Sequence, residues 1–163
     1  MEKIEMDILF TAFCGTSAEQ LLKRTGQKGL FLPNDKVLDA RLLTEEILAK
    51  KYDYVFSFGQ KPNIKDKIYI EEAARKNGEC KKTAFDCERL AALFRAHQME
   101  ARISGNAGTS FCNSLYWNGL DFIQRRGLDV KMVFVHIPMR KNITDFEKFG
   151  RMVLEVVHFF AAS

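Results

Sequence analysis

The sequence contains few of the residues that build metal sites and disulfide frameworks. Its four cysteines are Cys14, Cys80, Cys87 and Cys112, and none of them belongs to a Cys-x-x-Cys pair. With only three histidines, no zinc-finger spacing can be written. This usage predicts free thiols in a reducing compartment rather than disulfides. We therefore expect a cytoplasmic protein that uses neither a metal ion nor another cofactor.

Long apolar runs and clustered charge are also missing. No apolar run approaches the length that crosses a membrane. The first seven residues carry three acidic side chains and no apolar core, which is not the pattern of a signal peptide. The net charge is only +4 and the basic residues are scattered, whereas nucleic-acid binding favours a clustered basic patch. Neither a membrane nor a nucleic acid is an expected partner.

The chain has 163 residues, enough for one domain with its own hydrophobic core. No internal repeat or linker divides it, so we expect residues 1–163 to form a single domain. Short β-rich runs alternate with helical stretches. The expected strands are residues 4–10, 29–33, 52–58, 67–70, 101–104 and 130–137, and the expected helices are 17–24, 38–51, 85–97, 112–125 and 144–160. This order predicts a three-layer α/β/α fold around a twisted, largely parallel or mixed sheet.

Local signals refine some of these boundaries. The second helix has its apolar period at Leu38, Leu42, Ile47 and Leu48. Gly127 is expected to close the fourth helix, because glycine is common just after a helix end. Thr144, with Glu147 three residues later, is expected to cap the last helix. Residues 78–83 read as an exposed loop.

The most informative stretch is Ser104–Tyr116, with the sequence SGNAGTSFCNSLY. Small, backbone-permissive residues run directly into a helical segment, and Cys112 lies at the junction. The first turn of a helix has unpaired N–H groups and a partial positive charge, and both favour a thiolate over a thiol. Cys112 is therefore the candidate nucleophile.

A nucleophilic thiol needs a base within hydrogen-bond reach and a group that orients the base. Ligands of open α/β sheets gather at the carboxyl ends of strands. Four candidates lie at such positions: Phe13, Gln60, Cys112 and His136. Taken alone, His136 is more readily a satisfied residue at the end of a buried strand. Glu71, which ends a short strand, is a candidate orienting acid, although taken alone it reads as a surface carboxylate beside Glu72.

Three segments of the chain together resemble the pyroglutamyl peptidase I family, cysteine peptidases that remove N-terminal pyroglutamate. The cysteine signature is matched by Ser104, Ala107, Gly108, Cys112 and Asn113, with Tyr116 one residue short of the family's tyrosine. The histidine motif F-x-H-[IVL]-P is matched by Phe134, His136, Ile137 and Pro138, and the glutamate context by Ile68, Glu71 and Ala74. Residues 8–13 and Gly59-Gln60 are similar to further family segments. The resemblance extends over essentially the whole chain.

The resemblance implies a Cys–His–Glu triad made by Cys112, His136 and Glu71, with Glu72 as a rival for the acid. It further implies that Phe13 stacks on the lactam ring, that Gln60 holds the lactam amide and that Phe111 lines the pocket. The implied partners are peptide substrates with a blocked N-terminus. Many family members are homo-oligomers, so self-association is also compatible with the resemblance.

The chain departs from the family around the expected pocket, as a short and divergent member would. The loop after the first strand is reduced to residues 14–17, and a Gly-Gly-Arg stretch is replaced by residues 61–64. The segment after the glutamate is replaced by residues 77–80. A pocket with fewer walls binds a lactam less selectively. The alternatives are therefore a peptidase acting on another small amide, or a ligand- or partner-binding protein with little peptidase activity.

Overall fold

The computed structural model describes residues 6–108 and 110–163. Its elements follow one another in the order β1 (Ile8–Phe13), α1 (Ser17–Arg24), β2 (Leu30–Leu32), α2 (Leu38–Ala49), β3 (Tyr54–Lys61), β4 (Lys67–Glu71), β5 (Ala73–Lys76), β6 (Glu79–Lys82), α3 (Cys87–Ala96), β7 (Glu100–Ser104), α4 (Phe111–Arg126), β8 (Lys131–Pro138), a 3₁₀ turn (Arg140–Asn142) and α5 (Phe146–Ala162). Strands and helices thus alternate along most of the chain, as predicted.

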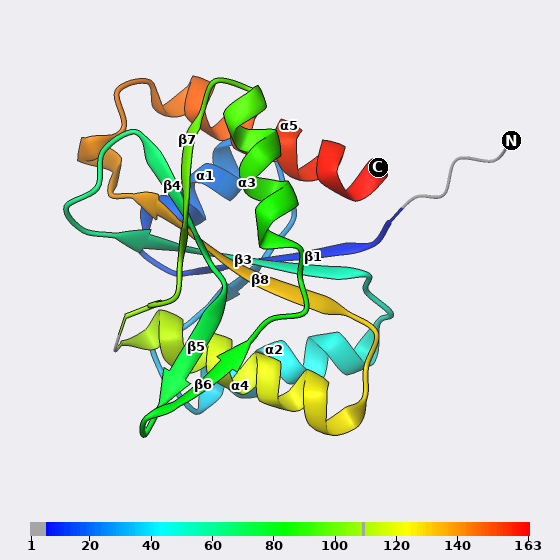
Figure 1. Ribbon diagram of the computed structural model, residues 1–163. Helices are drawn as coiled ribbons and strands as arrows, with labels where there is room; N and C mark the ends of the chain where they lie inside the picture. Colours follow the sequence, from blue (N-terminus) through cyan, green and yellow to red (C-terminus); the bar gives the residue numbers. More distant parts are fainter. Residues whose placement is uncertain (1–5, 109) are drawn as a thin grey trace, which may run out of the picture.

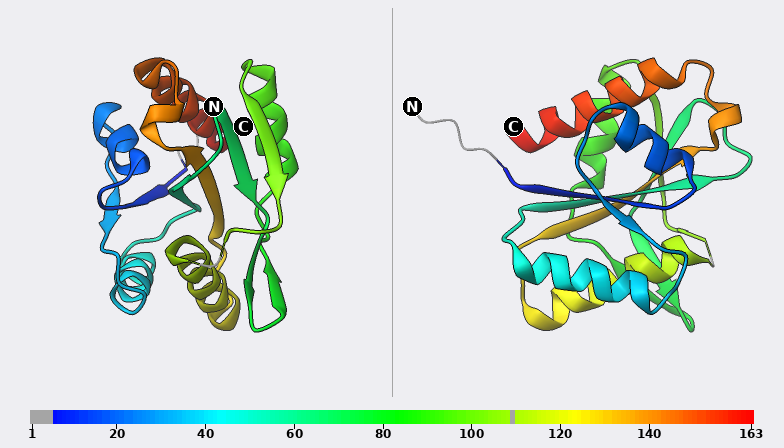
Figure 2. Two further views of the ribbon diagram at one scale, coloured as in Figure 1. Left: turned by 90° about the vertical axis from the view of Figure 1, so that its left-hand side faces the viewer. Right: turned by 180° about the vertical axis from the view of Figure 1, so that it is seen from behind.

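The main sheet is mixed but mostly parallel. Its strand order is β2-β1-β3-β8-β4-β7, and every neighbouring pair is parallel except β4 and β8. The sheet twists strongly, so that β4 and β7 cross the direction of β1 and β3 in Figure 1. Helices α1, α3 and α5 cover one face, and α2, α4 and the small β5–β6 sheet cover the other (Figures 1 and 2). The predicted three-layer α/β/α fold is confirmed.

Alternation along the strands divides the core into two clusters. In β8, Val133, Val135 and Ile137 join the cluster under α1, α3 and α5, whereas Met132 and Phe134 join the cluster under α2 and α4. Each fully buried Leu, Ile or Phe side chain stabilises the fold by about 1.5–3 kcal/mol relative to exposure. His136 has the parity of Phe134 and therefore faces α4.

The first strand and the last helix begin later than their sequences predict. Of the expected strand at residues 4–10, residues 4 and 5 lie outside the described residues. Strand β1 runs from Ile8 to Phe13 because it pairs with β3 from Ile8 to Ala12 and with β2 from Thr11 to Phe13. The predicted Thr144 cap of the last helix is wrong. The Asp145 side chain accepts the bond from Lys148 N, while Thr144 donates from its backbone and its hydroxyl to Asp66.

The predicted loop at residues 78–83 is in fact part of a β-hairpin. Strands β5 and β6 pair antiparallel around Asn77 and Gly78, whose φ angles are +50° and +78°. Two consecutive positive φ angles are what a two-residue type I′ turn requires, and Asn-Gly suits it. The hairpin was missed because its strands are short and mostly exposed, so they show no apolar alternation.

Helix α2 buries only part of the apolar face that its sequence indicates, since Ile47 is buried and Leu42 is partly buried against the core as predicted. Leu38 and Leu48 are exposed, whereas Asp39, Leu43 and Ile47 are buried, one turn apart. Packing against α4 and the sheet decides this orientation. The Gly127 prediction is confirmed, since this residue ends α4 in the left-handed conformation at φ +60°.

Candidate active site

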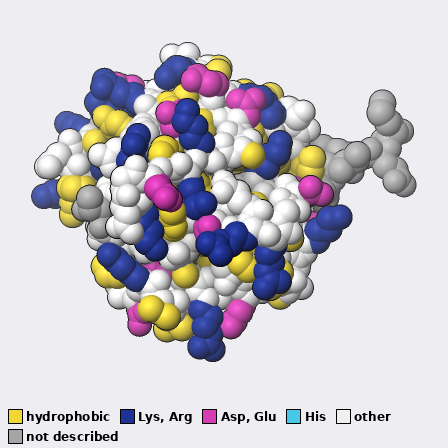
Figure 3. All heavy atoms as spheres, turned by 60° about the horizontal axis from the view of Figure 1, so that its bottom comes forward, with side chains coloured by type: hydrophobic (Ala, Val, Ile, Leu, Met, Phe, Trp, Pro, Cys, Tyr) yellow, Lys and Arg dark blue, Asp and Glu magenta, His cyan; other side chains and the backbone are white. Residues whose placement is uncertain are grey.

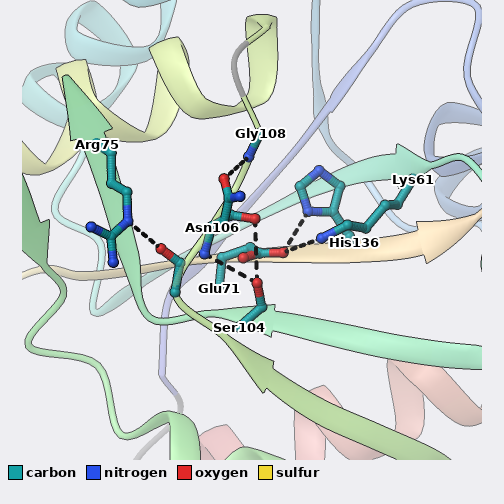
Figure 4. Close-up of polar contacts among 8 residues, drawn as sticks. Lys61, Glu71, Arg75, Ser104, Asn106, Gly108 and His136 are labelled. Atoms are coloured by element: carbon teal, nitrogen blue, oxygen red, sulfur yellow. Dashed lines mark hydrogen bonds and ion pairs between the residues drawn. The ribbon is translucent and has the colours of Figure 1, made fainter. Parts of the chain in front are cut away.

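A buried carboxylate–imidazole pair forms the centre of the site. Glu71 ends β4 with no exposed surface, and its Oε1 lies 3.0 Å from Nδ1 of His136 in β8 (Figure 4). The antiparallel ladder explains the contact, because Glu71 lies opposite Phe134 and therefore diagonal to His136 on the same face. A carboxylate only accepts, so Nδ1 carries the proton and Nε2 is left as the basic nitrogen.

The thiol of Cys112 lies over β3 beside this histidine. A Cβ atom built on Gly59 would be 2.7 Å from the sulfur, and Gly59 is directly opposite His136 in the β3–β8 ladder. Cys112 is the second residue of α4, whose first-turn N–H groups have no partner within the helix. The structure thus brings Glu71, His136 and Cys112 to one face of the sheet.

The electrostatic surroundings favour a neutral thiol in the absence of a base. Burial, together with the charges of Glu71 and Asp39, raises the pKa of the Cys112 thiol to about 12. The backbone N–H at the helix start and the Lys61 ammonium oppose this rise in the pKa. A thiol with such a pKa becomes a nucleophile when a neighbouring imidazole takes its proton.

Lys61 is a member of the cluster that sequence reasoning missed. Its Nζ lies 3.3 Å from the same Glu71 oxygen that holds His136, and 4.6 Å from the ring centroid of Tyr69 (Figure 4). Glu71 Oε2 has no hydrogen-bond partner within the described part of the chain. One buried oxygen therefore serves an ammonium and an imidazole together. The parity of Lys61 with Gly59 in β3 was the available signal, since it places both on the α4 face.

The loop before Cys112 is held by its own polar groups. Asn106 N donates to Ser104 Oγ at 3.1 Å, and Gly108 N donates to Asn106 Oδ1 at 3.0 Å (Figure 4). The Arg75 guanidinium donates to the Gly105 carbonyl at 2.8 Å. Gly108 has a φ of +92°, which only glycine adopts readily. Thr109 lies outside the described residues.

Asn113, the residue after the cysteine, clamps the hairpin to α4. Its Oδ1 accepts from Arg75 N at 2.9 Å, and its Nδ2 donates to Arg75 O at 2.8 Å. On the buried side of the same helix, Tyr116 donates from its hydroxyl to the Glu71 carbonyl at 2.8 Å. These bonds fix the start of α4 relative to the end of β4, and so fix the cysteine relative to the glutamate.

Two of the three predicted substrate contacts lie near the cysteine. Phe13 at the end of β1 and Phe111 at the start of α4 have ring centroids 6.1 Å apart. The third predicted contact, Gln60, faces the opposite side of the sheet from these two rings. It has the parity of Phe56 and Phe58, which face the other core cluster, and its Oε1 accepts from Ser17 N at the start of α1.

The reason for the convergence differs from the one that the sequence suggested. The sequence predicts that the candidate site residues lie together at one edge of the sheet, where the strands have their carboxyl ends. Because β4 and β7 run opposite to β8, their carboxyl ends do not lie at the same edge of the sheet as that of β8. The residues meet on the α4 face instead, across the antiparallel ladder. No group of three or more His, Cys, Asp or Glu within the described ranges is arranged to hold a metal ion.

Gly59 leaves the space that the thiol occupies, so we expect Gly59→Ala to damage the site. The added methyl would lie 2.7 Å from Cys112 Sγ and 2.8 Å from Phe134 Cε1, closer than real contacts allow. We expect urea denaturation to show a free energy of unfolding lower by about 1–3 kcal/mol. The matched control is Gly105→Ala, whose methyl meets only ordinary contacts at 3.5 Å and 3.6 Å. Equal stability of the two variants would contradict the packing described here.

Comparison with known proteins shows the family to which the chain belongs. Residues 59–157 match the sequence model of the pyroglutamyl peptidase family, which is more than half of the chain. The fold is that of solved pyroglutamyl peptidases: the enzyme from Bacillus amyloliquefaciens superimposes with a TM-score of 0.85 at 18% identity, covering 98% of this chain and 96% of the other. Pyrrolidone carboxyl peptidase from Thermococcus litoralis gives a TM-score of 0.76 at 18% identity, covering 93% and 92%. The chain belongs to the pyroglutamyl peptidase family.

Relatives in sequence are matched over a shorter stretch. The pyrrolidone-carboxylate peptidases of Thermoanaerobacter sp. (strain X514) and Thermoanaerobacter pseudethanolicus are each 34% identical over 65 residues. This stretch covers 36% of the chain and spans about a third (32%) of each relative. The solved structures are only 18% identical to the chain, so their similarity shows that the fold is shared.

Proposed function

We propose that this protein is a cysteine peptidase that releases an N-terminal pyroglutamyl residue from peptides. The observation that carries the proposal is the buried Glu71–His136 pair, 3.0 Å apart, beside a thiol at the start of α4. Membership of the family supports the same chemistry.

In the proposed mechanism the Cys112 thiol gives its proton to His136 Nε2, and the sulfur attacks the carbonyl carbon of the pyroglutamyl residue. The carbonyl electron pair moves to oxygen, and first-turn N–H groups of α4 stabilise this oxyanion. As the oxyanion collapses, the bond to the leaving nitrogen breaks and His136 returns the proton to the amine. Water then hydrolyses the thioester with His136 as base. Glu71 holds the imidazole in the required tautomer.

The substrate side of the proposal depends on the two aromatic rings. Phe13 and Phe111 form an apolar pair at the start of α4 and suit the flat face of a lactam. The role of Gln60 in binding the lactam amide stays a prediction, and its side chain is already bonded to Ser17.

We also propose a cytoplasmic location, from the cysteine usage, and self-association, for which the half-exposed Phe159 on α5 offers an apolar contact. Within the described residues, no helix is both long and apolar enough to span a membrane.

The test is hydrolysis of two coumarin amides, one pyroglutamyl and one alanyl. We expect the pyroglutamyl amide to be cleaved faster, with loss of activity after iodoacetamide treatment and alkylation found at Cys112 by peptide mass spectrometry. Preferred cleavage of the alanyl amide would indicate a peptidase of other specificity. Cleavage of neither substrate would indicate a binding protein and would overturn the proposal.

A further inference from the structure

Asp39 in the first turn of α2 is fully buried, yet neither of its carboxyl oxygens has a hydrogen-bond partner in the part of the chain that the structure describes. Buried polar groups in native proteins are nearly always bonded, because dehydration of an unpaired carboxylate is costly. The triad chemistry does not use this carboxylate. Its burial without a partner therefore calls for a ligand or substrate group.

Asp39 does not contribute to the stability of the fold as a carboxylate. Burial, together with the Asp35 charge, raises its pKa to about 6 against the opposing effects of the Ala40 amide and Lys36. Because the pKa in the folded protein is above the ordinary value, ionisation at neutral pH favours the unfolded chain. A carboxyl group that reduces stability and is still present is typical of a functional position.

Helix α2 packs against α4, the helix that begins with the Cys112 segment (Figure 1). Lys36, just before α2, has its Nζ 5.7 Å from the Phe111 ring centroid, and Leu43 within α2 has its Cδ2 3.2 Å from the position of a Cβ on Gly119. Asp39 lies between these two contacts, on the face of Leu43. This places it beside the first turn of α4, and its charge acts on the Cys112 thiol.

The chemistry of the attack defines what a carboxylate in this position meets. Cys112 would attack the carbonyl carbon of the substrate's first residue, and the nitrogen of that residue is two bonds away from this carbon. A carboxylate beside the thiol therefore meets an N–H donor. In a pyroglutamyl residue the donor is an uncharged lactam N–H, and in an unblocked peptide it is an α-ammonium, to which a carboxylate binds more strongly.

We propose that Asp39 is a specificity-determining residue that accepts a hydrogen bond from the nitrogen of the substrate's N-terminal residue. The inference rests on the proposed peptidase function, since it takes Cys112 as the nucleophile. It also predicts that the site tolerates an α-ammonium, because an ionised acceptor adds charge attraction to the hydrogen bond. The lactam N–H and the α-ammonium should therefore respond differently when Asp39 is replaced.

The test compares Asp39→Asn and Asp39→Leu with the native protein, with kcat and KM measured on the pyroglutamyl and alanyl coumarin amides. We expect Asp39→Leu to raise the melting temperature and to raise KM for the pyroglutamyl amide about tenfold, with a smaller change in kcat. Asp39→Asn keeps an acceptor oxygen and should have a milder effect on the lactam. Any cleavage of the alanyl amide should fall by about a hundredfold in both variants, since both lose the charge.

The matched control is Asp35→Asn on the same segment. Asp35 is exposed and accepts from Val37 N and Leu38 N, so this variant should change stability and leave KM unchanged. A more stable Asp39→Leu variant with unchanged KM for both amides would overturn the inference while the proposed function stands. If the native protein cleaves neither amide, the proposed function fails. Titration of pyroglutamide into native and Asp39→Leu protein then tests Asp39, and equal Kd values or no binding would overturn its role.

Discussion

Replacing Cys112 by serine should reduce hydrolysis of the pyroglutamyl amide by about 10³-fold or more, because a serine hydroxyl in this position is a far weaker nucleophile. The buried surroundings that already oppose ionisation of the thiol oppose ionisation of a hydroxyl still more strongly. The fold should persist, since oxygen is smaller than sulfur and the half-buried side chain loses little contact. The measurement is kcat/KM together with the melting temperature.

The chain provides its own controls for this experiment. Cys14 and Cys80 are exposed free thiols. Cys14→Ser and Cys80→Ser should keep the native activity and the native sensitivity to iodoacetamide. Undiminished hydrolysis by Cys112→Ser would show that the nucleophile has been wrongly assigned, whereas loss of activity in Cys14→Ser would point to a role at the rim of the pocket.

Much of the fold could be predicted because most elements show a clear period. The continuous apolar run of β8 and the glycine at the end of α4 are local signals, and the structure shows a strand buried along almost its whole length and a left-handed Gly127. The hairpin at β5 and β6 lacked such a signal. Its Asn77-Gly78 turn is visible in the sequence, but the flanking residues are held by contacts with α4, including Asn113, rather than by burial of an apolar face.

The site was harder to predict than the fold, because strand direction and helix packing are not local properties. Nothing near Glu71 shows that β4 runs antiparallel to β8, which is what brings the glutamate diagonal to His136. The side of the sheet that Gln60 faces could be predicted from the sequence, because Gln60 alternates in step with Phe56 and Phe58. The burial of Asp39 could not be predicted, because the neighbouring Leu38 is apolar and is the residue expected to face the core.

Glu71 and Glu72 were rivals in the sequence, and their surroundings now separate them. The side chain of Glu71 is buried and bonds His136 and Lys61, whereas Glu72 is half-buried and forms no ion pair with another described residue. Strand alternation gives the cause. Ile68 and Ile70 face the other core cluster, so Glu71 faces α4 with the parity of Tyr69.

Glu71→Gln should therefore lower kcat/KM by about 10²- to 10⁴-fold, and Glu72→Gln should leave it within about twofold. The glutamine amide can present its NH₂ group to Nδ1 of His136, which favours the tautomer with the proton on Nε2, and that nitrogen then cannot accept the thiol proton. Removal of the charge also deprives the imidazolium of its counter-ion. Loss of the ion pairs should reduce the free energy of unfolding by about 1–3 kcal/mol, measured by urea denaturation.

The double variant Glu71→Gln/Lys61→Met separates an effect on His136 from an effect on Lys61. If Glu71 acts by orienting and stabilising His136, removal of Lys61 should regain stability without regaining activity, since the imidazole still lacks its carboxylate. Recovery of activity in the double variant would instead mean that an unpaired ammonium beside Cys112 caused the loss. A larger loss in Glu72→Gln than in Glu71→Gln would assign the acid to Glu72 and contradict the geometry of the β4–β8 ladder as the basis of the triad.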